Sequence, residues 1–209
     1  RLDREHLAQL RELVRVLAGA HEPRGLAPVV EAQPDDPGDL AQRRRAAVAD
    51  RVVEQADRVA VTPIRRRQYL VSEWAKLAPN AGIDPTGEQL EAWLRLGNDV
   101  IERWNEPHRA YHDERHLEDV LLSLNQLETR GERVDVMTIL SAWFHDAVYE
   151  GVGGEDEEAS ARVAVTSLGE IGLADPLIQR VGELIVATTP TFVHAHIDTP
   201  LAHILDADL

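Results

Sequence analysis

The chain has 209 residues, of which 44% are apolar, and its formal net charge is −15. It contains no cysteine, which excludes disulfides and zinc–thiolate sites, and no apolar run approaches the roughly 20 residues that cross a bilayer. The acidic excess repels polyanions, so we expect no nucleic-acid partner and no anionic membrane partner. The missing cysteines and bilayer-crossing runs lead us to expect a cytoplasmic location. A small phosphorylated substrate stays allowed, because a bound cation reverses the field locally.

Helical periodicity runs through most of the chain, and strand signals are scarce, so the sequence predicts an all-α fold. The helices are expected at about 7–17, 39–60, 63 to beyond 74, 90–104, from within 106–117 to 127, 134–148, 157–171, 175–188 and from about 201 onward. Residues 24–38 and 151–156 are expected to be loops.

A stretch with two prolines and two glycines, Leu77 to Gly87, predicts a boundary. It separates an N-terminal helical segment of unknown role, 1–80, from a domain at 81–209. The chain starts at Arg1 rather than Met and stops at Leu209 inside a predicted helix. We therefore expect part of a longer protein, with a domain truncated at its C-terminus.

The first candidate site is the pair His145-Asp146, near the end of the most hydrophobic predicted helix. Burying a carboxylate there is costly unless it is paired, hydrogen-bonded or bound to a cation. Thr138, Ser141 and His145 fall at i, i+3 and i+7 and form a narrow polar stripe. The pair indicates a metal site, and an internal His–Asp hydrogen bond is the alternative.

Two histidines stand in the segment from Glu106 to Leu117, which is expected to open a helix whose buried face includes Val120. His116 lies one turn before Val120 and therefore points toward the core side of its helix. His112 lies four residues earlier and shares that face if the helix starts early enough, a known metal-ligand spacing. A capping or surface histidine is the alternative for both.

An acidic pair, Asp206 and Asp208, lies in the last predicted helix between apolar residues. The apolar flanks indicate a buried helix whose carboxylates need a counter-charge. A solvated acidic helix face is the alternative.

Four motifs together resemble the HD superfamily of metal-dependent phosphohydrolases. They are Glu-Pro-His-Arg-Ala-Tyr-His-x-x-x-His-Leu from residue 106, Ala-Trp-Phe-His-Asp-Ala-Val-Tyr from 142, Glu-Glu-x-Ser-Ala from 157 and Leu-Asp-Ala-Asp-Leu from 205. More narrowly, they look like a bacterial group of predicted metal-dependent HD phosphohydrolases. The resemblance covers roughly residues 88–209 and implies an HD-domain-like helical bundle carrying an additional N-terminal helical segment.

The resemblance also implies that one divalent ion is bound by His116, His145, Asp146 and Asp208. Asp206 is the fallback for the last of these ligands. Such a mixed set accepts Mn, Fe, Co, Ni, Zn or Mg. A second ion is left open, with His194 or His196 as additional ligands, and a loop histidine without a metal role is the alternative for both.

Other residues take expected roles around the ion. Asp146 is expected to orient a water or take its proton, and Glu158, beside Glu157, is a candidate proton acceptor. For the two glutamates, a favourable acidic first turn of a helix is the alternative. Arg109 and His112 are expected to contact the negative charge of the substrate.

The resemblance implies hydrolysis of a small phosphate ester, with nucleotides as the first substrates to try; phosphomonoesterase and phosphodiesterase activity are both open. The alternative is a non-catalytic helical binding module in which the metal is structural. A third interpretation is a helical domain without metal. Association into a homo-oligomer stays open.

Overall fold

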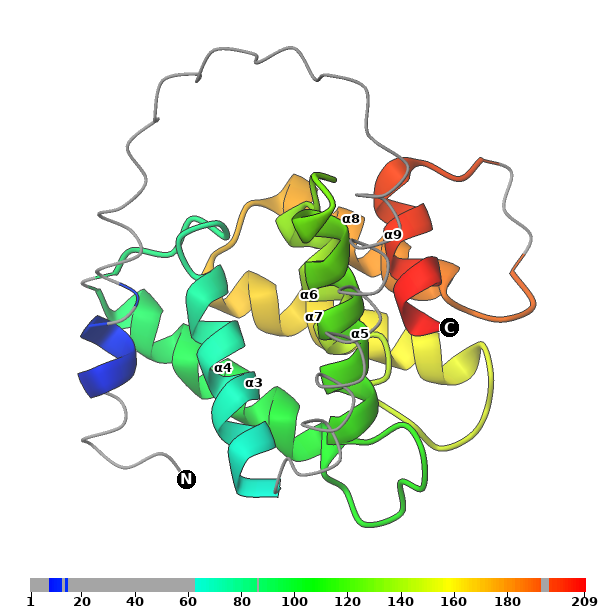
Figure 1. Ribbon diagram of the computed structural model, residues 1–209, viewed down its shortest axis with the longest axis horizontal. Helices are drawn as coiled ribbons and strands as arrows, with labels where there is room; N and C mark the ends of the chain where they lie inside the picture. Colours follow the sequence, from blue (N-terminus) through cyan, green and yellow to red (C-terminus); the bar gives the residue numbers. More distant parts are fainter. Residues whose placement is uncertain (1–7, 13, 15–62, 86, 193–195) are drawn as a thin grey trace, which may run out of the picture.

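The computed structural model describes residues 8–12, 14, 63–85, 87–192 and 196–209 (Figure 1). Every regular element within these ranges is an α-helix, which confirms the predicted all-α class. The helices are α3 (Pro63–Leu77), α4 (Glu88–Trp104), α5 (Glu114–Thr129), α6 (Val136–Phe144), α7 (Glu155–Ile171), α8 (Asp175–Ala187) and α9 (Thr199–Asp208). Residues 8–12 and 14 are also helical, and the helix predicted at 39–60 lies outside the described ranges.

None of the described helices is both long enough and apolar enough to span a membrane.

Three helix ends differ from the prediction, and two of the differences shape the candidate site. The helix expected at 134–148 ends at Phe144, so His145 and Asp146 follow it. The segment 106–113 is a loop, and α5 begins only at Glu114 because Asp113 is its N-cap. The third difference is at α7, which begins inside the loop expected at 151–156.

A tryptophan pair joins α3 to α4. The Trp74 and Trp93 rings stack with centroids 4.4 Å apart, and each indole N–H donates to the other's backbone carbonyl, at 2.8 and 3.1 Å. Gly97 allows this packing, because a Cβ there would lie 2.1 Å from the Trp74 ring. α3 therefore shares a core with the helices that follow it. The division into two segments at residue 80 stays a prediction, because residues 15–62 of the N-terminal segment lie outside the described ranges.

The central helix is α6, which contacts α5, α7, α8 and α9. Its Trp143 and Phe144 are fully buried, as the apolar pattern predicted. Trp104, the last residue of α4, donates from its indole nitrogen to the carbonyl of Trp143 at 2.9 Å. This bond fixes the end of α4 beneath the end of α6. Because α9 packs on both α5 and α6, the C-terminal end of the chain also reaches this region (Figure 1).

Candidate metal centre

His116 is placed by the N-terminal turn of α5. The carboxylate of Asp113 accepts from the backbone N–H groups of Arg115, at 2.8 Å, and of His116, at 3.3 Å. This cap starts the helix just before the histidine, whose side chain is 6% exposed. His116 therefore enters the core side of α5, as its spacing from Val120 predicted.

His145 has one ring nitrogen committed to the backbone. Nδ1 lies 2.9 Å from the carbonyl oxygen of Ala142 and donates to it, which leaves Nε2 with the lone pair in the neutral ring. Nε2 is buried and makes no hydrogen bond of good geometry to any described residue. It still lies 3.1 Å from Asp208 Oδ1 and 3.4 Å from Asp146 Oδ2. A lone pair facing two carboxylates is repelled unless a proton or a metal ion lies between them.

Asp208 joins the two histidines from the end of α9. Its Oδ1 lies 2.9 Å from His116 Nε2 and 3.1 Å from His145 Nε2. Asp206, the fallback ligand, is exposed and lies outside both groups of residues that can hold an ion. Those groups are His116, His145 and Asp208, and His112, His116 and Asp146.

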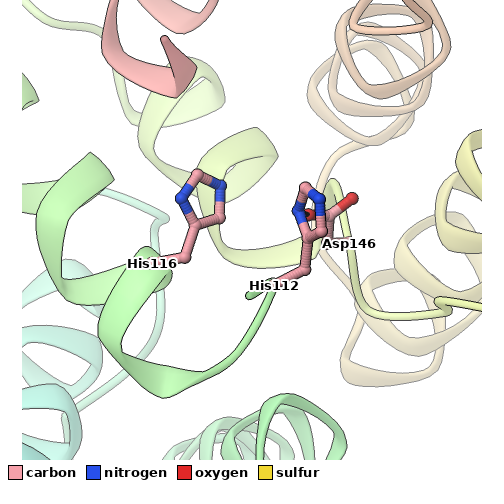
Figure 2. A group of neighbouring side chains, drawn as sticks. All are labelled: His112, His116 and Asp146. Atoms are coloured by element: carbon pink, nitrogen blue, oxygen red, sulfur yellow. Dashed lines mark hydrogen bonds and ion pairs between the residues drawn. The ribbon is translucent and has the colours of Figure 1, made fainter. Parts of the chain in front are cut away.

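His112 reaches the cluster from the loop before α5. Its Nδ1 lies 2.6 Å from Asp146 Oδ2, and the His112 side chain is 32% exposed. Figure 2 shows His112 and Asp146 close together, with His116 beside them on α5. The helical i, i+4 relation expected for His112 and His116 does not apply, because α5 starts after His112.

The charges of the cluster shift its pKa values in opposite directions. Burial lowers the pKa of His145, but the carboxylates of Asp146 and Asp208 outweigh burial and raise it from 6.5 to about 9. Burial raises the pKa of Asp208, yet its contacts with His116 and His145 hold that pKa well below the usual range. Burial also raises the pKa of Asp146, but His145 and His112 outweigh burial and lower that pKa. The hydrogen bond to Asp146 raises the pKa of His112.

The donor atoms have the spacing of ligands around one ion. Donors bound at about 2.1 Å lie roughly 3.0 Å apart in an octahedral site and roughly 3.4 Å apart in a tetrahedral one. In the group His116, His145 and Asp208, Oδ1 of Asp208 lies 2.9 and 3.1 Å from the two histidine nitrogens. Asp146 lies 3.4 Å from His145 Nε2 but belongs to the other group, with His112 and His116. Imidazoles combined with carboxylates suit a first-row transition metal. The described residues therefore fit a divalent cation.

Arg109 has a different use in the structure from the predicted substrate contact. Its side chain is 0% exposed. Its guanidinium donates to the backbone carbonyls of His112, Asp146 and Ala147 and to the carboxylate of Glu106. The guanidinium therefore faces the protein rather than a space for substrate.

The glutamates at the start of α7 are not brought into the cluster. Glu158, a predicted catalytic residue, is exposed and pairs with Arg162 one turn later, at 3.6 Å. Glu157 caps its own helix by accepting from the N–H of Gly154. Both contacts match the alternative considered for them, an acidic first turn.

A neighbouring acidic residue, Asp156, holds the backbone of the loop before α7. Asp156 is buried, and its Oδ2 accepts from three consecutive backbone N–H groups, those of residues 150, 151 and 152, at 2.7 to 3.0 Å. It thereby fixes the loop that follows the His145-Asp146 pair.

Of the two histidines considered for a second ion, His196 is exposed and belongs to neither group of possible ligands. His194 lies outside the described residues. Among the described residues, the second group of possible ligands is the one that contains His112.

Sequence reasoning did not identify three features that shape this centre. Asp113 is a residue type that commonly caps helices, but the helix was expected to start earlier, near Pro107. Trp104 forms a wall of the site, with its ring centroid 5.3 Å from that of His145 and 6.1 Å from that of His116. The carbonyl partners of Arg109 depend on long-range packing and have no local sequence signal.

Comparisons of the chain with protein-family models, with curated proteins and with solved structures find no match. The resemblance of the four motifs therefore stays a prediction, and function has to be inferred from the geometry of the site.

Proposed function

We propose that the protein is a divalent-metal-dependent phosphohydrolase acting on a small phosphate ester, with nucleotides as the first candidates. The supporting observation is the buried, unpartnered Nε2 of His145, which faces the carboxylates of Asp146 and Asp208. The HD-domain-like arrangement and the four-ligand set are part of this proposal.

In this proposal His116, His145, Asp146 and Asp208 hold the ion. When bound, a divalent ion supplies Lewis-acid polarisation of a phosphate ester and lowers the pKa of the attacking water. The protein contributes fixed orientation: the carbonyl of Ala142 accepts from Nδ1 of His145, and the carboxylate of Asp113 holds the backbone N–H of His116 at the start of α5.

Accessibility supports a proposal for the side from which substrate enters. Among the five cluster residues, His112 and Asp208 are the most exposed, at 32% and 26%, while His145 is 2% exposed. Substrate therefore approaches past His112, and Asp146, which accepts from it, is the carboxylate placed to orient a water. His112 is the residue we assign to contact the phosphate, because Arg109 is already fully hydrogen-bonded within the protein.

Because all the guanidinium hydrogen bonds of Arg109 are made within the protein, one alternative function is favoured. It is a binding module in which the metal only stabilises the fold. A phosphate site normally offers a free cationic fork to the substrate's remaining charge. Turnover decides between the two functions.

The test is hydrolysis of p-nitrophenyl phosphate and a nucleotide panel, with Mn²⁺, Co²⁺, Ni²⁺, Zn²⁺ or Mg²⁺ supplied separately. We expect metal-dependent turnover that Asp146→Asn lowers at least 100-fold and that a chelator abolishes. Asp206→Asn, an exposed aspartate on α9, is the matched control and should retain activity. A folded, metal-loaded protein without turnover on any ester would establish the binding module instead.

A further inference from the structure

We propose that Arg109 is a positioning residue of the metal centre, whose guanidinium fixes the backbone of two cluster residues and so sets metal affinity. The inference rests on the proposed metal site and assigns Arg109 a role in assembling it.

The hydrogen bonds of Arg109 use its complete donor set. A guanidinium carries five N–H groups. Nη1 donates to the carbonyls of His112, at 3.0 Å, and Asp146, at 2.8 Å, and Nη2 donates to the carbonyl of Ala147, at 3.3 Å. Nη2 and Nε also donate to Glu106 Oε2, at 3.2 and 3.4 Å. Five donors therefore make five bonds, three of them to main-chain carbonyls.

The surroundings hold the guanidinium in this orientation. Arg109 Cζ lies 5.6 Å from the centroid of the Trp104 ring and 5.7 Å from that of the Tyr149 ring, both within the range of cation–π attraction. Trp104 is fully buried and also contacts the His145 ring. Arg109 is therefore packed directly against the wall of the centre without touching a ligand side chain.

The carbonyls that Arg109 binds belong to two segments that must meet for the cluster to form. One segment is the loop before α5, which carries His112, and the other is the turn after α6, which carries Asp146. Neither segment is helical, so helix hydrogen bonds do not fix its backbone. By bridging the two carbonyls from one nitrogen, Arg109 sets the separation at which His112 Nδ1 and Asp146 Oδ2 lie 2.6 Å apart.

Lysine keeps the charge but offers a single nitrogen without a planar fork, so it cannot reproduce the three carbonyl bonds together with those to Glu106. Groups that orient metal ligands from behind typically change metal affinity 10- to 100-fold when removed. We expect a loss of that size for Arg109→Lys and Arg109→Ala.

The experiment is a Co²⁺ titration of the full chain, followed by the visible d–d absorption of the bound ion, with thermal unfolding of the metal-free protein as a check on folding. The variants are Arg109→Lys, Arg109→Ala and Glu106→Gln, which leaves the carbonyl bonds in place. Arg66→Ala is the matched control. Arg66 is also an arginine in an ion pair, with Glu118 at 2.6 Å, and its side chain is 18% exposed, but it forms no ion pair with a cluster residue.

We expect both Arg109 variants to bind Co²⁺ 10- to 100-fold more weakly with an altered d–d spectrum, while Glu106→Gln and Arg66→Ala stay near wild type. Added guanidinium, far below denaturing concentrations, should restore affinity to Arg109→Ala. Wild-type affinity and spectrum in a folded Arg109→Lys protein, or an equal loss in Arg66→Ala, would overturn the inference. Failure of the wild-type protein to bind Co²⁺ would instead refute the proposed metal site.

Discussion

The raised pKa of His145 predicts different pH dependences of stability for the metal-free and the metal-bound protein. In the metal-free protein, the proton on Nε2 is held between Asp146 and Asp208, and the folded pKa is about 9 against 6.5 for an unperturbed histidine. A group whose folded pKa is raised contributes stability that is fully present below the unfolded pKa and is lost as the pH rises through the folded pKa. The metal-free protein should therefore lose stability between pH 6.5 and pH 9.

The size of the loss follows from the two pKa values. Each step of one in pKa is worth about 1.4 kcal/mol, so the difference between 9 and 6.5 corresponds to about 3 kcal/mol of unfolding free energy. For a domain of about 150 to 250 residues, that amounts to a decrease in Tm of roughly 6 to 12 °C. His112 adds a contribution of the same sign, because its pKa is also raised.

The assay is thermal unfolding by circular dichroism across pH 6.5 to 9, with chelator and with Zn²⁺ or Mn²⁺. Metal binding needs Nε2 of His145 without its proton, and the histidine of the unfolded chain is also mostly unprotonated above pH 6.5. Tm of the metal-saturated protein should therefore stay nearly constant over the range in which Tm of the metal-free protein falls. His145→Gln removes the main titrating group and should make the metal-free curve less steep, leaving the contribution of His112. A metal-free wild-type Tm that stays constant, or rises, from pH 6.5 to 9 would refute the charge assignment of the cluster.

Three further substitutions test the local structure. Gly97→Ala drives a Cβ into the Trp74 ring and should cost at least about 1–3 kcal/mol, measured by urea unfolding. Asp156→Ala removes the acceptor of three backbone N–H groups and should cost about 2–4 kcal/mol, with faster amide exchange at residues 150–152. Glu158→Gln should leave turnover unchanged, because the Glu158 carboxylate is exposed and pairs with Arg162. A large drop in kcat would show that Glu158 acts in the reaction.

The all-α class could be predicted because helical periodicity is a local property of the sequence. The apolar run around Trp143 and Phe144 likewise predicted the buried α6. The end of that helix could not be placed, since apolar residues continue through Ala147 and Val148 while the chain leaves the helix at His145. The sequence also placed His116 on the core side of α5 from its spacing to Val120.

Contacts between distant segments could not be read in the same way. Asp208 and His116 are 92 residues apart and meet only because α9 packs along α5. The partners of Arg109 are carbonyls, and a carbonyl is present at every residue, so no residue type marks them. An arginine before a candidate histidine thus suggested a phosphate contact, whereas the fold uses it to join two loops.

The most direct test of the central claim is elemental analysis of the purified protein after exposure to a divalent metal and removal of the excess. We predict about one bound ion for the wild type and for Asp206→Asn, and strongly reduced occupancy for Asp208→Asn, which removes the charge between His116 and His145. Equal metal content in Asp208→Asn and Asp206→Asn, or none in the wild type, would contradict the account.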